Sequence, residues 1–154
     1  MTNNDKLRRI RYALDISDRE VIKLFSLADY DITQDELDAL FKKEDENGFY
    51  ECPDDVAALF LQGLIASRRG KRDDAGARKD AGRVLSNNDI LKALRIALQL
   101  RDEDIIEIMD AERQKVAKSE INALFRKKGQ PNFRPCGDQF LRHFLAGLTS
   151  KYRK

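Results

Sequence analysis

The sequence is poor in the residue types on which most catalytic and metal centres depend. Its 154 residues include one histidine, His143, and two cysteines, Cys52 and Cys136, which do not form a CxxC motif. One imidazole cannot provide the histidine pair of a zinc site, and any Ser-His-Asp or Cys-His arrangement would have to include that single ring. We therefore expect no metal, no cofactor and no catalytic residues, and we predict that the protein is not an enzyme.

Long apolar runs are also missing. No stretch approaches the length that a membrane span needs, and residues 1–5 lack the basic and apolar segments of a signal peptide. Two cysteines far apart in the sequence are typical of a reducing compartment rather than of a disulfide scaffold. No glycine-rich phosphate-binding motif occurs. These absences predict a cytoplasmic protein that does not associate with membranes.

The residues that are present favour a folded protein over a disordered one. Apolar residues make up 42% of the chain, which is enough for a packed core. Charged residues make up 36%, with 29 Lys and Arg against 27 Asp and Glu. Because the net charge is only +2, the whole-molecule charge by itself indicates no polyanionic partner.

An internal repeat organises the chain. A shift of 84 positions aligns residues 2–70 with residues 86–154 without a gap, and 22 of the 69 aligned pairs are identical. The identities are clustered: residues 3–5 match residues 87–89 as Asn-Asn-Asp, and residues 39–41 match residues 123–125 as Ala-Leu-Phe. The chain is therefore a duplication, which one sequence is sufficient to establish.

Each copy shows four helical segments. Apolar residues recur at the period of an amphipathic helix, as in Leu7, Ile10 and Leu14. Hydroxyl residues that can serve as helix N-caps precede several segments: Thr2, Ser17, Thr33 and Ser86. The last segment of each copy has a glycine in its middle, Gly63 or Gly147. A glycine there costs about 1 kcal/mol relative to alanine, so its recurrence indicates a close approach to another helix.

The expected fold class is all-α, with two tandem copies of a four-helix module. The predicted units are an acidic repeat at residues 2–70, a charged linker at residues 71–85 and a basic repeat at residues 86–154. A module of this size has only a small core of its own, so we expect the copies to pack about a pseudo-twofold axis. The alternative is two separate units on a flexible linker.

The doubled pattern resembles the YehS-like family of bacterial proteins. The resemblance depends on the Asn-Asn-Asp that opens each copy and on the Ala-Leu-Phe before a loop that ends in cysteine, Cys52 or Cys136. It covers essentially the whole chain and includes residues 43–46 and 136–142. The family consists of duplicated helical domains of unknown function, so the resemblance implies an all-α fold and a bacterial cytoplasmic setting. It implies no activity and no catalytic residue.

The two copies differ most in charge. Residues 2–70 contain 10 basic and 15 acidic residues, a net charge of −5, whereas residues 86–154 contain 14 basic and 9 acidic residues, a net charge of +5. In the second copy, basic and polar residues gather around the predicted third helix. The candidate nucleic-acid-binding residues are Lys115, Lys118, Ser119, Asn122, Arg126, Lys127, Lys128 and Arg134.

Three interpretations of this charge remain open. The second and third helices have helix-turn-helix order, so the basic residues could contact nucleic acid, with lysines and arginines on phosphate. Alternatively, the acidic copy of one chain could meet the basic copy of another chain or of a protein partner, which includes assembly into a homo-oligomer. The third interpretation is a solvated charged face without a partner. The sequence predicts a binding module but does not decide between nucleic acid and protein.

Overall fold

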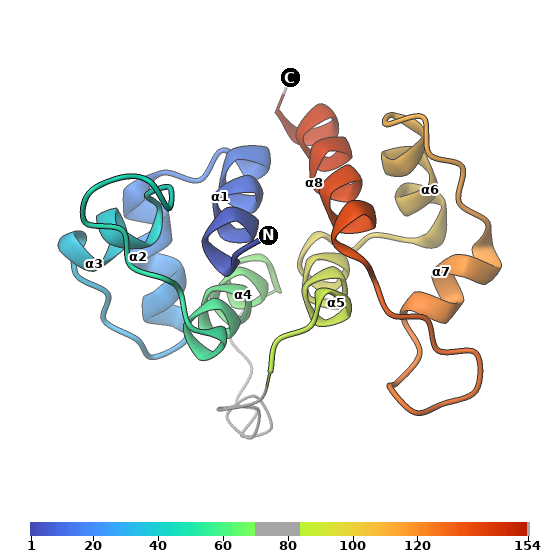
Figure 1. Ribbon diagram of the computed structural model, residues 1–154, viewed down its shortest axis with the longest axis horizontal. Helices are drawn as coiled ribbons and strands as arrows, with labels where there is room; N and C mark the ends of the chain where they lie inside the picture. The colour runs from blue at the N-terminus through green and yellow to red at the C-terminus, as the bar shows by residue number, and fades with distance from the viewer. Residues whose placement is uncertain (70–83, 154) are drawn as a thin grey trace.

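The computed structural model describes residues 1–69 and 84–153, which form eight helices and no strand (Figure 1). The first copy contributes α1 (Asn3–Leu14), α2 (Asp18–Leu27), α3 (Gln34–Leu40) and α4 (Asp54–Arg69). The second copy contributes α5 (Asn87–Leu98), α6 (Asp102–Asp110), α7 (Lys118–Leu124) and α8 (Asp138–Tyr152). The prediction of an all-α fold with four helices in each copy is confirmed. The predicted linker, residues 71–85, lies outside the described residues except for Val84 and Leu85.

The predicted N-caps begin the expected helices. In each case the side-chain oxygen accepts a hydrogen bond from the third helical residue, as the capping rule requires. These residues are Thr2, Ser17, Thr33 and Ser86. Arg101 and Ala117, which precede α6 and α7, make no side-chain cap. The second copy thus retains one of the three hydroxyl caps found in the first.

An asparagine ties the first helix of each copy to the end of the third helix and to the loop that leads into the last helix. Asn4 Nδ2 donates to the carbonyl oxygens of Leu40 and Tyr50 at 2.7 and 2.8 Å, and its Oδ1 accepts from the Cys52 amide at 2.8 Å. Asn88 makes the three equivalent bonds in the second copy, at 2.9, 2.9 and 2.8 Å. The repeated Asn-Asn-Asp motif therefore closes each module on itself.

The repeated glycines mark places where two helices touch. A Cβ atom added to Gly63 in α4 would lie 1.9 Å from the carbonyl oxygen of Leu24 in α2. A Cβ atom added to Gly147 in α8 would lie 2.2 Å from the carbonyl oxygen of Ile108 in α6. The predicted close approach is confirmed in both copies, and it sets the distance between the second and the last helix of each module.

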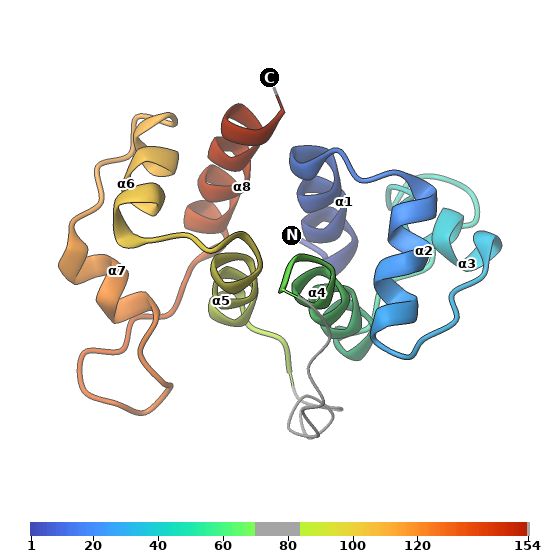
Figure 2. The ribbon, with the colours of Figure 1, turned by 180° about the vertical axis from the view of Figure 1, so that it is seen from behind.

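The two copies pack together through the first and last helix of each. Helix α1 lies against α8 and α4 lies against α5, and the views from the two sides agree (Figures 1 and 2). The shift of 84 positions converts α1 into α5 and α4 into α8, so the two contacts are the same contact made twice. The copies therefore pack about a pseudo-twofold axis, and the buried apolar residues of both belong to one core. Two separate units on a flexible linker do not describe this arrangement.

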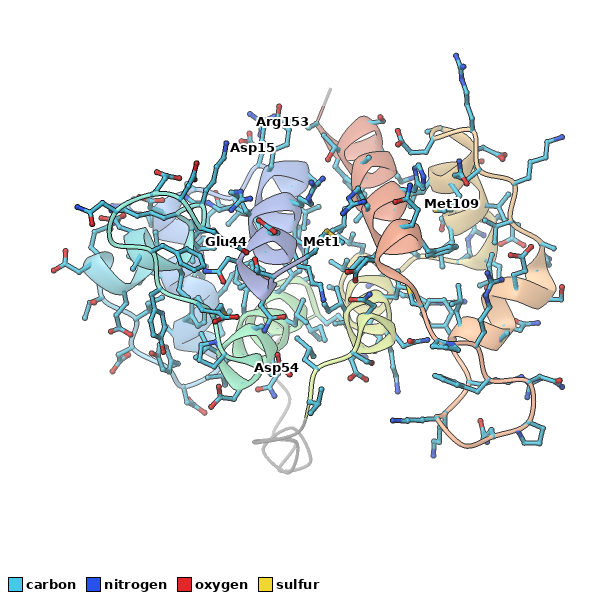
Figure 3. All side chains as sticks on the ribbon, in the orientation of Figure 1. Met1, Asp15, Glu44, Asp54, Met109 and Arg153 are labelled. Carbon is cyan, nitrogen blue, oxygen red and sulfur yellow. The ribbon has the colours of Figure 1, made fainter. Side chains whose placement is uncertain are left out.

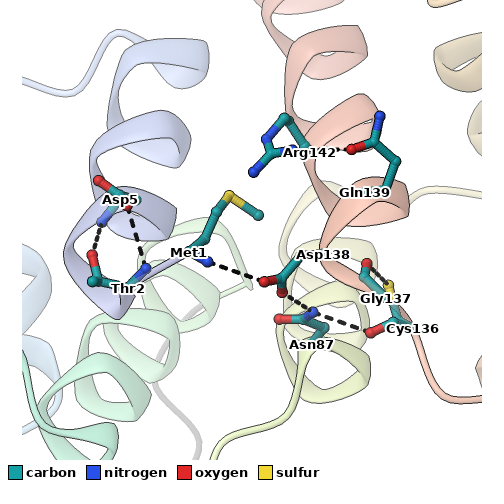
Figure 4. Close-up of polar contacts among 9 residues, drawn as sticks. All are labelled: Met1, Thr2, Asp5, Asn87, Cys136, Gly137, Asp138, Gln139 and Arg142. Carbon is teal, nitrogen blue, oxygen red and sulfur yellow. Dashed lines mark hydrogen bonds and ion pairs between the residues drawn. The ribbon is translucent and has the colours of Figure 1, made fainter.

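Polar contacts join the copies at both ends of the α1–α8 pair. Where the helices end, Arg153 Nη1 donates to Asp15 Oδ1 at 3.0 Å (Figure 3). Where they begin, the Met1 amine donates to Asp138 Oδ2 at 3.0 Å, and Asn87 Nδ2 donates to Asp138 Oδ1 at 2.8 Å (Figure 4). Because the N-terminal ends of the two helices meet and their C-terminal ends meet, α1 and α8 run parallel.

The α4–α5 pair repeats the contact at its start. Asp54 Oδ1 accepts from Asn3 Nδ2 at 2.7 Å, and Asp54 Oδ2 accepts from the backbone amide of Leu85 at 2.8 Å. Leu85 is the repeat equivalent of Met1. Each aspartate thus connects an asparagine of its own copy with the first residue of the other copy.

Candidate nucleic-acid interface

The eight candidate residues lie together at one end of the molecule, on α7 and the two segments beside it (Figure 1). Three of them are in the helix itself, one is in the link from α6, and four follow the helix. All eight are exposed: Lys115, Lys118, Ser119, Asn122, Arg126, Lys127, Lys128 and Arg134. We call this set the α7 patch.

Two cations of the α7 patch are neutralised locally. Lys118 Nζ lies 3.3 Å from Glu103 Oε1, and Arg134 Nη1 lies 3.0 Å from Glu120 Oε2. The other four, Lys115 and the run Arg126 to Lys128, make no ion pair with any residue in ranges 1–69 and 84–153. Four charges are therefore available to an external anion, and two act mainly within the fold.

The backbone presents the Arg126 to Lys128 run in a defined loop. The Lys127 amide donates to Gln130 Oε1 at 2.9 Å, and Gly129 adopts φ = +94°, a region that favours glycine. The Arg134 amide then donates to the carbonyl oxygen of Ala123 at 3.0 Å, which returns the chain to α7. The three consecutive cations thus belong to a loop that is held by hydrogen bonds within the loop and back to α7.

The first copy has the same order of helices and loop at the opposite end of the molecule but a different surface. Figure 1 shows α3 and α7 at opposite ends of the long axis. The positions equivalent to the α7 patch carry mostly acidic or neutral side chains: Asp31, Gln34, Asp35, Asp38, Lys42, Lys43, Glu44 and Tyr50. The duplicated scaffold therefore ends in one acidic tip and one basic tip.

The local geometry differs from a DNA-binding helix-turn-helix. Such motifs join their helices by about three or four residues, whereas the link between α6 and α7 runs from residue 111 to residue 117. Helix α7 has only 7 residues, about two turns. The order of helices matches the motif, but the length of the link and of α7 favour contact with phosphates over insertion of a helix into a groove.

The single histidine lies at the edge of α8. His143 is half-buried, with Nδ1 3.4 Å from Glu112 Oε1 and Nε2 3.0 Å from Gln139 Nε2. Neither neighbour is a serine or a cysteine that the imidazole could activate. His143 thus packs at the edge of the helix.

The two cysteines are buried and poorly reactive. Burial, together with nearby aspartates, raises the pKa of both thiols to about 12; the aspartates are Asp55 and Asp54 beside Cys52 and Asp138 beside Cys136. Both cysteines are free. A thiol with such a pKa is protonated at neutral pH and is a weak nucleophile.

In the described part of the chain, no cluster of three or more His, Cys, Asp or Glu residues is arranged to hold a metal ion. The same part of the chain has no helix that is long and apolar enough to cross a membrane.

A second basic surface was missed by the sequence analysis. A hollow of about 540 Å³ lies between the end of α4, helix α5 and the end of α7. Its lining combines three cations with apolar side chains: Arg69, Lys92, Arg95, Ile96, Gln99, Leu100 and Phe125. The only signal in the sequence was that Arg69 matches Arg153 at the last identical pair of the repeat.

Comparisons with known proteins agree with the duplicated architecture. Residues 3–70 and 87–154 each match the family described as Protein of unknown function (DUF1456). The chain is 41% identical over 151 residues to the protein described as Uncharacterized protein YehS from Escherichia coli (strain K12), covering 98% of this chain and 96% of that protein. No solved structure matches. The chain therefore belongs to the DUF1456 family, and its two repeats are two copies of the family's domain.

Proposed function

We propose that this protein is a cytoplasmic, non-enzymatic binding protein that holds nucleic acid through the phosphate backbone, using the α7 patch. The proposal is supported above all by four cations at one tip of the molecule that make no ion pair with the residues that the structure describes. A polyanion would gain from these charges and would release its counterions, which favours association at low salt. Ser119 and Asn122 lie on the same exposed surface and could hydrogen-bond to phosphate or base edges.

The direct test is a fluorescence anisotropy titration of labelled mixed-sequence DNA and RNA at low salt. Lys127→Glu together with Lys128→Glu is expected to weaken binding at least tenfold and to reduce the salt dependence of the affinity. Lys43→Glu is the matched control, because Lys43 occupies the position equivalent to Lys127 at the acidic tip. Equal affinity of the double variant and the natural protein would refute the proposal.

A second candidate function is supported by the opposite charges of the two tips. The acidic tip of one chain could bind the basic tip of the next, and complementary charge would steer that contact. Because the tips lie at opposite ends of the long axis (Figure 1), the contact is heterologous and can extend beyond a dimer. Multi-angle light scattering at low and high salt tests this: a monomer under both conditions excludes self-association.

A further inference from the structure

The two copies are joined at equivalent corners, but only one corner is neutralised. Where α8 ends on α1, Arg153 Nη1 donates to the carbonyl oxygen of Tyr12 and to Asp15 Oδ1, both at 3.0 Å (Figure 3). The guanidinium carbon also lies 4.0 Å from the centre of the Tyr12 ring. The C-terminal arginine of the first corner is thus paired by a carboxylate and covers an aromatic ring.

The corner where α4 ends on α5 has neither the carboxylate nor the aromatic ring that contact the arginine at the first corner. The repeat equivalent of Arg153 is Arg69, that of Asp15 is Gln99 and that of Tyr12 is Ile96. All three line the hollow of about 540 Å³. Arg69 and Lys92 are exposed and make no ion pair within the described ranges. The corner therefore keeps its cations while the carboxylate is absent.

Arg95, the third cation, has a structural role. Its Nη2 lies 2.9 Å from Asp102 Oδ1, and its guanidinium carbon lies 4.6 Å from the centre of the Phe125 ring. Arg11, its counterpart in the first copy, is similarly paired with Asp18 and lies over Phe41 at 4.8 Å. Because this arrangement occurs in both copies, it belongs to the scaffold and leaves Arg69 and Lys92 as the free charges of the hollow.

We infer that this hollow binds a small organic phosphate, with Arg69 and Lys92 contacting the phosphate group. At the sibling corner the arginine binds a carboxylate, which is an oxyanion, and the hollow offers a guanidinium and an ammonium on one lining, which suits a doubly charged oxyanion. Ile96, Leu100 and Phe125 offer apolar contacts to the remainder of the ligand.

Isothermal titration calorimetry tests the inference with three probes: phenyl phosphate, adenosine 5′-monophosphate and inorganic phosphate. We expect both organic phosphates to bind at least tenfold more tightly than inorganic phosphate, because only they reach the apolar wall. Arg69→Ala with Lys92→Ala is expected to weaken their binding at least tenfold. Organic phosphates that do not bind, or that bind the double variant equally well, would overturn the inference, and equal affinity for inorganic phosphate would overturn the role of the apolar wall.

Gln99→Asp is a more specific test, because it places at position 99 the same acid that Asp15 provides at the sibling corner. Gln99 and Asp15 share the left-handed conformation, with φ of 54° and 53°, so aspartate fits the backbone at position 99. We expect the new carboxylate to pair with Arg69 and to weaken organic phosphate binding at least tenfold. Undiminished binding by this variant would contradict the role of Arg69.

Two controls separate the hollow from other surfaces. Arg153→Ala removes the paired arginine at the sibling corner and should leave organic phosphate affinity unchanged. Lys127→Glu with Lys128→Glu should also leave it unchanged, because those residues lie in the α7 patch and not in the hollow. If the α7 variant abolished binding while the Arg69 and Lys92 variant did not, the phosphate would be bound by the α7 patch and the inference would be wrong.

Discussion

At the scale of single residues, the asparagines of the repeated motif do most to hold each module together. Asn4 is 1% exposed and satisfies the carbonyl oxygen of Leu40 at the end of α3, as well as one carbonyl oxygen and one amide of the following loop. Only an amide side chain provides two donors and an acceptor in one short group. An aspartate would lack the donors and would add a buried charge, which explains why both copies use asparagine.

We predict that Asn4→Ala lowers the free energy of unfolding by about 2–4 kcal/mol, because buried backbone groups would lose their partners. Urea unfolding followed by circular dichroism measures the effect. Asn47→Ala is the control, because Asn47 lies in the exposed loop and only its carbonyl oxygen is bonded, to Lys42 Nζ. A loss for Asn4→Ala no larger than that of the control would contradict the role assigned to the motif.

At the scale of helices, the distance between the second and the last helix of each copy is set by a glycine. In an exposed helix, replacing glycine by alanine gains about 1 kcal/mol. At Gly63 the added carbon would meet backbone atoms of Leu24, which cannot move aside as a flexible side chain could. The helix-forming preference of alanine and the packing of α4 on α2 therefore act in opposite directions, and packing dominates.

Gly63→Ala is accordingly expected to destabilise the protein by about 1–3 kcal/mol, the usual cost of overpacking a core. Gly137→Ala is the control, because a Cβ atom at Gly137 would meet nothing within 4 Å. The midpoint of thermal unfolding measures the effect: we expect it to fall for Gly63→Ala and to stay unchanged for Gly137→Ala. A midpoint equal to or above that of the natural protein would show that α4 and α2 can separate without cost.

At the scale of the whole molecule, two aspartates join the copies and make the association sensitive to acid. The hydrogen bond from Asn3 lowers the pKa of Asp54 below its ordinary value of 3.8, and the amide of Leu85 adds to this effect. The hydrogen bond from Asn87 and the Met1 amine likewise lower the pKa of Asp138. Both carboxylates must be ionised for these contacts between the copies to contribute fully.

A pKa that is lower in the folded state than in the unfolded state stabilises the fold above the unfolded value. The contribution of Asp54 and Asp138 should therefore be present at neutral pH and be lost as pH falls below about 4 toward the folded values. Urea unfolding over this acid range should show a shallower pH dependence for Asp54→Asn with Asp138→Asn than for the natural protein. If the free energy of unfolding depended on acid pH equally in the variant and the natural protein, other carboxylates would account for that dependence.

The sequence was sufficient for the helices but not for the contacts of the cations. Helical period predicted all eight helices, and hydroxyl caps marked the start of four of them, because a hydroxyl such as Thr33 acts on an amide only three residues away. The α7 patch was also predicted, since its members are near one another in the chain. The hollow was not, because Arg69, Lys92 and Phe125 line one surface only when α4 packs on α5 and α7 ends beside them.

The sequence by itself determined the all-α fold, the duplication and the unequal charges of the two copies, because these depend on residue type and local spacing. Only the tertiary structure decided which helices meet. A stripe such as Leu7 and Ile10 shows that a face is buried, but many apolar faces could cover it equally well. The choice of α8 as the partner of α1 depends on the packing of both copies at once, and so does the position of Arg69 on the lining of the hollow.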